Sequence, residues 1–253
     1  MITDPWFYLI AVPAIAIVGL AKGGFLSGMA VLGVPMLSLI ISPVQAAGIM
    51  LPILISMDAI GVWAYRRSFD MANLKIMAPA TVVGIAIGWA TAAHVSEAHV
   101  RLIVGLVAFT FTLDYWLALR PHKTGQAPGK LTGSFWATLA GFTSFVSHAG
   151  SPPAQMFLLP QRLPNLIYAG TMAVLFAWIN LVKVVPYYLL GQFSPGNLAT
   201  TAVLLPLAPL AMIAGIRLVR RVRQEPFYRI AYGCLFVVSV KLIWDGGREI
   251  FGV

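Results

Sequence analysis

The chain has 253 residues, of which 59% are hydrophobic and only 10% are charged, and its mean hydropathy is +0.86. So few charged side chains cannot cover a soluble domain of this size, and repeated apolar runs indicate an all-α, polytopic membrane protein. The net charge of +9 does not indicate a nucleic-acid partner, because the basic residues gather in short loops, as expected for a protein surrounded by membrane lipid.

The first apolar run, MITDPWFYLIAVPAIAIVG, is not a signal peptide, because it lacks a basic start and carries an aspartate before the apolar residues. It ends where Lys22, Gly23 and Gly24 interrupt a sequence that otherwise suits the lipid phase. The interruption separates two short arms, residues 6–20 and 26–41. Because non-helical backbone at membrane depth is tolerated only inside protein or beside a water-filled cavity, we predict a broken or re-entrant hairpin here.

A second interrupted region predicts a second broken hairpin. Its arms, residues 131–147 and 152–160, flank the sequence SHAGSPP. We therefore divide the chain into a first membrane repeat at 1–120, a cytoplasmic linker at 121–130 and a second repeat at 131–253, with three long helices after each hairpin. Long membrane helices are predicted over 46–65, 75–92, 99–119, 166–189, 198–218 and 229–247.

The distribution of charge between loops predicts the orientation of the chain. The loops at 66–75, 120–130 and 217–225 are rich in Lys and Arg, so they should be cytoplasmic. The loops at 92–99 and 191–197 carry neither residue, so they should face outward. If each hairpin crosses the membrane twice, both termini are periplasmic.

The two halves share residues at a nearly constant spacing of 122 to 128 positions, which indicates an internal duplication. The basic loop 66–75 corresponds to the uncharged loop 191–197, so corresponding loops should lie on opposite faces of the membrane. This is expected for two inverted-topology repeats, in which a substrate binds at the midplane where broken helices meet. The matched pairs are Gly48 and Gly170, Met50 and Met172, Tyr65 and Tyr187, Asn73 and Asn197, Arg101 and Arg229, Gly105 and Gly233, and Trp116 and Trp244.

The two breaks carry groups that suit an anion. Free N–H groups and the dipole at the start of a helix attract negative charge, and glycines let the backbone approach a ligand closely. Alternatively, the glycines only permit close helix packing, and Lys22 extends toward a lipid headgroup. The predicted binding residues at the breaks are Lys22, Gly23, Gly24 and Ser27 in the first half and His148, Gly150, Ser151 and Gln155 in the second.

Three further polar residues lie inside apolar helices. Asp58 and Asn180 occupy corresponding positions in the two halves, and Lys183 follows shortly after. Such groups are costly in a membrane and usually face a cavity or a partner. Asn180 and Lys183 are therefore predicted to contact the anion, and Asp58 is a candidate for carrying a coupling proton. A structural pair of Asp58 with Lys183 or with Lys22 is an equally open alternative.

The other reactive side chains are given structural interpretations, and neither a metal site nor a cofactor is expected. Cys234 is interpreted as a small core residue, Lys241 and Asp245 as a local pair, and His94, His99 and His122 as solvated loop residues. One enzyme alternative exists, an intramembrane hydrolase that uses Ser144 or Ser151, with Ser147 nearby, and His148 as base. No G-x-S-x-G sequence surrounds these serines.

Both interrupted segments resemble the TauE/SafE sulfite exporter family. The resemblance is carried by GLAKGGFLSGMAVLGVPML, and by HAGSPPAQ (His148–Gln155) with the later LPQRL, GT and NLVKVVPY, and it covers nearly the whole chain. It implies a transporter, not an enzyme, that exports a small sulfur-containing anion across a bacterial inner membrane. Sulfite, sulfoacetate, thiosulfate or a related organosulfonate are the implied substrates.

The mode of transport stays open at this stage. The chain has no phosphate-binding G-x-x-x-x-G-K-[ST] sequence, so energy must come from an ion gradient, the anion gradient or a separate partner. Because the cell interior is negative, efflux of an anion is favourable by about 2.3 kcal/mol per charge per 100 mV. An anion channel is an alternative that the residues do not distinguish from a carrier, and they do not give the oligomeric state.

Overall fold

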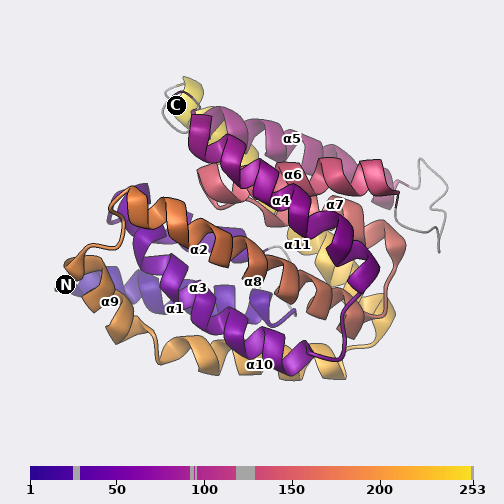
Figure 1. Ribbon diagram of the computed structural model, residues 1–253, viewed down its shortest axis with the longest axis horizontal. Helices are drawn as coiled ribbons and strands as arrows, with labels where there is room; N and C mark the ends of the chain where they lie inside the picture. The colour runs from indigo at the N-terminus through magenta and orange to yellow at the C-terminus, as the bar shows by residue number, and fades with distance from the viewer. Residues whose placement is uncertain (25–28, 92–93, 95, 118–128, 252–253) are drawn as a thin grey trace.

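The computed structural model describes residues 1–24, 29–91, 94, 96–117 and 129–251, and every regular element among them is a helix (Figure 1). The elements are α1 (Pro5–Lys22), η1 (Met29–Leu32), α2 (Gly33–Leu37), α3 (Pro43–Tyr65), α4 (Met71–Thr91), α5 (Glu97–Trp116), α6 (Lys130–Ser147), α7 (Ser151–Leu158), η2 (Leu159–Gln161), α8 (Asn165–Leu189), α9 (Pro195–Leu204), α10 (Leu207–Arg221) and α11 (Gln224–Phe251), where η marks a 3-10 helix.

Three of these helices begin with a polar cap followed by proline. The Asp4 side chain accepts a hydrogen bond from the Trp6 amide before α1, and Ser42 and Ser194 cap α3 and α9 in the same manner. Proline suits the first helical position because its missing N–H has no partner there in any case. These caps fix where the helices begin.

Both predicted interruptions are present. Helix α1 ends before Gly23, and Gly24 has a positive φ of 100°. Helix α6 ends at His148, which is left-handed with φ of 54°, and α7 begins at Ser151. We call the interruption after Lys22 the first break and residues 148–150 the second break.

Two features of the helices differ from the prediction. Residues 198–218 were expected to form one helix, but α9 and α10 form a pair bent by 48°. The bend falls at Leu205 and Pro206, because proline removes a helical hydrogen bond and clashes with the preceding turn. In addition, α1 was expected to be a short arm, whereas its 18 residues are enough to cross a membrane.

Among the described residues, five helices are long and apolar enough to span a membrane, namely α1, α3, α4, α8 and α11, or six if the bent pair α9–α10 counts as one span. The packing follows a reciprocal scheme, in which α1 packs on α10, α6 on α4, α3 on α8, and α5 on α11. Small residues allow close approach at these contacts. A Cβ at Gly23 would lie 2.6 Å from Gly215 Cα between α1 and α10, and one at Gly141 would meet the Thr81 carbonyl between α6 and α4.

The bundle has two distinct ends, and both chain termini lie at the left of Figure 1. At this end, which we call the termini end, the Ile2 amide donates to the Thr200 hydroxyl of α9. At the opposite end the loops after α3, η2 and α10 meet, and Asn73 bonds Gln161 while Asn165 bonds the Val222 carbonyl. We call this the basic end, because it gathers Arg66, Arg67, Lys75, Arg162, Arg217, Arg220, Arg221 and Arg223.

Candidate functional site

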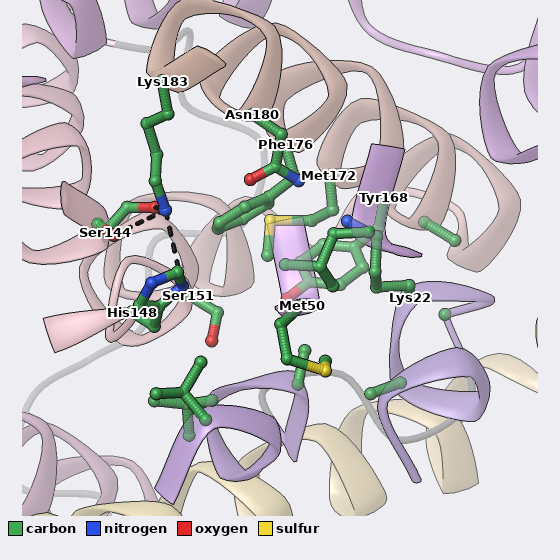
Figure 2. Close-up of a pocket in the computed structure, with 17 residues that line it drawn as sticks. Lys22, Met50, Ser144, His148, Ser151, Tyr168, Met172, Phe176, Asn180 and Lys183 are labelled. Atoms are coloured by element: carbon green, nitrogen blue, oxygen red, sulfur yellow. Dashed lines mark hydrogen bonds between the residues drawn. The ribbon is translucent and has the colours of Figure 1, made fainter. Parts of the chain in front are cut away.

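A cavity of about 70 Å³ lies between the two breaks (Figure 2). This is several times the roughly 10–15 Å³ that one water molecule requires, so the cavity has room for an anion of a few heavy atoms. It is lined by Ala21, Lys22, Gly24, Ala30, Val31, Val34, Met50, Leu54, Ser144, His148, Ser151, Tyr168, Ala169, Met172, Phe176, Asn180 and Lys183.

On the first-half side of the cavity, three side chains form a buried polar cluster. The Lys22 ammonium lies 2.6 Å from Asp58 Oδ1, and Asn180 Nδ2 donates to Asp58 Oδ2 at 2.7 Å. The side chains of Lys22 and Asp58 are only 8% and 5% exposed. Of the open alternatives, the structural pair of Asp58 with Lys22 is therefore observed, and Lys22 does not extend to a headgroup.

On the opposite side, Lys183 has a different environment. Its ammonium donates to the Ser144 carbonyl at 2.8 Å and lies 3.4 Å from His148 Nδ1. Both contacts are drawn in Figure 2. Lys183 is fully buried, and in the described part of the chain no carboxylate lies within ion-pairing distance of it. A buried ammonium group without a counter-charge is energetically costly.

The second break offers side chains more than backbone groups. Pro152 and Pro153 follow Ser151 at the start of α7, and prolines have no N–H to offer an anion. Ser151 and His148 line the cavity from this break. The groups that could contact an anion on this side are therefore the side chains of Lys183, His148 and the serines rather than a row of amides.

The residues predicted to bind the anion form two groups, those that line the cavity and those that do not. Lys22, Gly24, His148, Ser151, Asn180 and Lys183 line the cavity. Gly23 and Gly150 do not, because Gly23 packs against Gly215 of α10 and a Cβ at Gly150 would lie 2.7 Å from Ser144 Cβ. For these two glycines the close-packing interpretation describes the observed contacts. Ser27 lies outside the described residues.

Gln155 is also absent from the cavity wall, although it is fully buried. It lies one turn after Ser151 on α7, and neither polar atom of its carboxamide has a hydrogen-bond partner among the described residues. Unpaired buried amide groups are unusual. Its predicted contact with the anion stays a prediction.

Several lining residues were missed by the sequence analysis. Ser144 was considered only as a nucleophile, and the apolar side chains Met50, Met172, Phe176 and Tyr168 were not considered. Apolar residues carry no signal that separates a cavity wall from the core. The spacing of Met50 and Met172, which are a matched pair of the duplication, was the one available indication.

The structural interpretations given to the remaining cysteine, histidine and charged side chains can be compared with the structure. Cys234 is buried, and Lys241 pairs with Asp245 at 2.7 Å. His94 and His99 are exposed, although His99 lies on α5 rather than in a loop. The remaining histidine, His122, lies outside the described residues.

The helices and the cavity define a multi-pass membrane protein with a buried cationic site. The chain matches the family "Sulfite exporter TauE/SafE" over residues 11–242, and it belongs to this family. It is therefore a membrane transporter of sulfur-containing anions. No curated protein and no solved structure matches the chain.

Family membership also decides against the hydrolase alternative, because TauE/SafE proteins are transporters and not enzymes. The geometry around His148 agrees with this. Its Nε2 lies 2.7 Å from the Tyr187 hydroxyl and its Nδ1 faces Lys183. Both ring nitrogens therefore have close neighbours other than a nucleophilic serine.

Proposed function

We propose that the protein exports a small sulfur oxyanion or organosulfonate as a secondary transporter, and that the anion binds in the cavity between the two breaks. Sulfite, sulfoacetate and thiosulfate are the candidate substrates. Lys183 is the main electrostatic contact, and Lys22, His148, Ser151 and Asn180 complete the polar wall.

The observation that carries this proposal is that Lys183, although fully buried, has no carboxylate within ion-pairing distance among the described residues. Lys22 is paired with Asp58, whereas the partners of Lys183 are a carbonyl and neutral side chains. A bound anion supplies the missing counter-charge inside a low-dielectric site, where charge–charge attraction is strong. With Lys183 protonated, the two lysines and Asp58 carry a net charge of +1, which offsets one negative charge of a bound anion.

Apolar side chains also line the cavity, and two of them, Met172 and Phe176, lie on α8 together with Asn180 and Lys183. Met50, Leu54, Met172 and Phe176 face the same space as the two lysines. Figure 2 shows Met50, Met172 and Phe176 beside the polar groups. This combination supports binding of a sulfonate whose carbon portion contacts apolar side chains, and it also admits sulfite, which is smaller.

The proposed direction and orientation rest on charge. If the basic end is cytoplasmic, in line with the positive-inside rule, both termini are periplasmic, because they lie at the other end. Efflux of an anion then proceeds down the membrane potential. In a bacterium the corresponding membrane is the inner membrane.

The inverted repeat remains part of the proposal, with residues 1–120 and 131–253 as its halves. The reciprocal packing supports it, because α1 packs on α10 while α6 packs on α4. The helices α3 and α8, which carry Asp58 and Asn180, pack on each other across the proposed axis. Broken helices that meet at such an axis are typical of substrate sites in secondary transporters.

Coupling to protons through Asp58 stays a prediction. Its carboxylate accepts from Asn180 and pairs with Lys22, so protonation would require loss of the ion pair. A substrate anion that competes for Lys22 would provide this change.

A thermal-shift screen of the detergent-solubilised protein tests the function. Sulfite, thiosulfate, sulfate, sulfoacetate and taurine are compared, and a ligand of the native state raises the apparent stability. We expect sulfite or sulfoacetate to stabilise the protein, by about 2.7 kcal/mol at a hundredfold excess over Kd. No stabilisation by any of the five compounds would contradict the proposal.

Counterflow in proteoliposomes separates a carrier from an anion channel. Unlabelled substrate on the far side accelerates uptake of labelled sulfite by a carrier and does not accelerate flow through a pore. We expect acceleration, because secondary transporters with broken helices at a central site move one repeat against the other around that site. Equal rates with and without trans-substrate would favour the channel.

A further inference from the structure

Two tyrosine hydroxyls hold the two breaks at opposite ends of the cavity. Tyr65, the last residue of α3, donates to the Gly23 carbonyl of the first break at 2.6 Å. Tyr187, near the end of α8, lies with its hydroxyl 2.7 Å from His148 Nε2 of the second break. Both tyrosines are buried. They are also a matched pair in the proposed duplication, and each hydroxyl contacts the break of its own half, Tyr65 at a backbone carbonyl and Tyr187 at a histidine ring nitrogen.

A second cavity, of about 50 Å³, lies beyond the second break. It shares Val34 and His148 with the central cavity, so these two side chains form a partition between the two spaces. Its other walls include Tyr187 and Gln192, together with Pro43 and Val44, which are exposed at the termini end. The partition is thus the barrier between the central cavity and that face of the protein.

Tyr187 fixes the position of this partition. His148 is the left-handed C-cap of α6, and it lines both cavities. The Tyr187 hydroxyl holds one ring nitrogen, and Lys183 faces the other at 3.4 Å. When an anion binds Lys183, the contact between Lys183 and His148 weakens, and Tyr187 becomes the principal restraint on the ring.

Tyr65 occupies the equivalent place at the basic end. Its hydroxyl holds the Gly23 carbonyl and would lie 3.5 Å from a Cβ added to Gly24, which lines the central cavity. The next residue, Arg66, is exposed at the basic end. Tyr65 therefore lies between the cavity and the basic face, as Tyr187 lies between the cavity and the termini face.

We propose that Tyr187 and Tyr65 are the two gating residues of transport, and that loss of one hydroxyl opens the central cavity toward one face only. This inference rests on the proposed function, because a gate has meaning only if the cavity carries a solute. It assigns opening toward the termini face to Tyr187 and opening toward the basic face to Tyr65.

Cysteine accessibility measures the opening of each gate directly. The reporter is Met172→Cys, which places a thiol in the central cavity, in a Cys234→Ala background that removes the native cysteine. The probe is the membrane-impermeant, anionic reagent 2-sulfonatoethyl methanethiosulfonate, which is added to one face of oriented proteoliposomes. Val44→Cys and Arg67→Cys, at exposed positions of the two ends, identify which face is labelled.

We expect Tyr187→Phe to raise the labelling rate from the termini face about fivefold, which corresponds to about 1 kcal/mol, the net contribution of one hydrogen bond. Labelling from the basic face should not rise. Tyr65→Phe should produce the opposite pattern. Both variants keep the aromatic ring, and thermal unfolding checks that they fold.

Tyr228→Phe is the matched control, because it removes a tyrosine hydroxyl that donates to the Leu163 carbonyl at 2.7 Å outside the cavity wall. It should leave labelling from both faces unchanged. Unchanged labelling in both gating variants, or an equal rise from both faces, would overturn the proposal.

The labelling experiment needs no transported substrate, so the two proposals can fail separately. If the side-specific change in labelling occurs but none of the five compounds binds, the gating proposal is supported and the substrate assignment is contradicted. If sulfite binds but labelling does not change, the anion site is supported and the gating proposal is contradicted.

Discussion

The first and second breaks differ in the chemistry of the side chains around them. At the first break Lys22 is neutralised by Asp58, and Gly23 packs against α10. At the second break Lys183 has no carboxylate partner among the described residues, and His148 replaces a glycine as the left-handed residue. The comparison supports the proposal that the first break mainly maintains the structure, and that Lys183 of α8, which faces the second break, provides the charge for an anion.

The largest expected effect concerns the ion pair at the first break. Asp58→Leu leaves Lys22 buried without a counter-charge, so the free energy of unfolding should fall by about 3–5 kcal/mol. Asp245→Asn is the matched control, because its pair with Lys241 is partly exposed and should contribute less than about 1 kcal/mol. Denaturant unfolding in detergent measures both values.

The double variant Lys22→Met/Asp58→Leu sharpens this test. Removing both charges together should restore most of the lost stability, since neither ion is then left alone. The Asn180 amide, which loses its acceptor, should account for about 1–3 kcal/mol of remaining loss. A double variant that is as unstable as the sum of the single variants would contradict the assignment of Lys22 to Asp58.

A smaller effect is expected at Gly24. Its φ of 100° suits only glycine, and an added Cβ would lie 2.7 Å from Ala169 Cβ. Gly24→Ala should lower the free energy of unfolding by about 2–4 kcal/mol, through backbone strain and overpacking. Gly191→Ala is the control, because that glycine has φ of 69° and open space around it.

In the Gly191→Ala control, the free energy of unfolding should fall only by the cost of backbone strain, roughly 1–2 kcal/mol. Thermal or denaturant unfolding of the two variants gives the difference. If Gly24→Ala costs no more than Gly191→Ala, the first break is looser than the structure indicates. The contrast with the second break, which accommodates His148 at φ of 54°, would then disappear.

The smallest effect on stability is expected at Lys183. Among the described residues Lys183 has hydrogen-bond partners but no carboxylate partner. Replacing it by methionine, which has a similar length, should change the free energy of unfolding of the ligand-free protein by less than about 1 kcal/mol, or raise it, because a buried ion without a counter-charge is removed. Lys22→Met leaves the buried Asp58 carboxylate without its cation, so it should instead lower the free energy of unfolding strongly. A similar loss in both lysine variants would show that the two breaks do not differ as proposed.

The sequence was informative where a local rule decides the structure. The breaks were predicted from charges and glycines inside apolar runs. The starts of α3 and α9 were predicted three residues too late, at 46 and 198, because a hydropathy window does not register the caps Ser42 and Ser194 before prolines. The bend at Pro206 was missed because a hydropathy window averages composition and is insensitive to one missing N–H. Pro206, inside the predicted helix 198–218, was nevertheless visible in the sequence as a helix-breaking residue.

The candidate site was less predictable, because it depends on which faces of distant helices meet. The sequence indicated that Asp58 needs a partner but left Lys22 and Lys183 equally open. It could not separate Gly24, which lines the cavity, from Gly23, which packs against α10. Only tertiary contacts distinguish these cases.

The most direct test of the central claim is equilibrium binding of radiolabelled sulfite and sulfoacetate to the purified protein. We predict that Lys183→Met weakens binding of the preferred anion by about 10- to 100-fold, as expected for loss of about 1.5–3 kcal/mol from a charged hydrogen bond. Lys241→Met, a lysine in a local pair on α11, should bind like the wild type. Wild-type affinity in Lys183→Met would contradict the assignment of this cavity as the anion site.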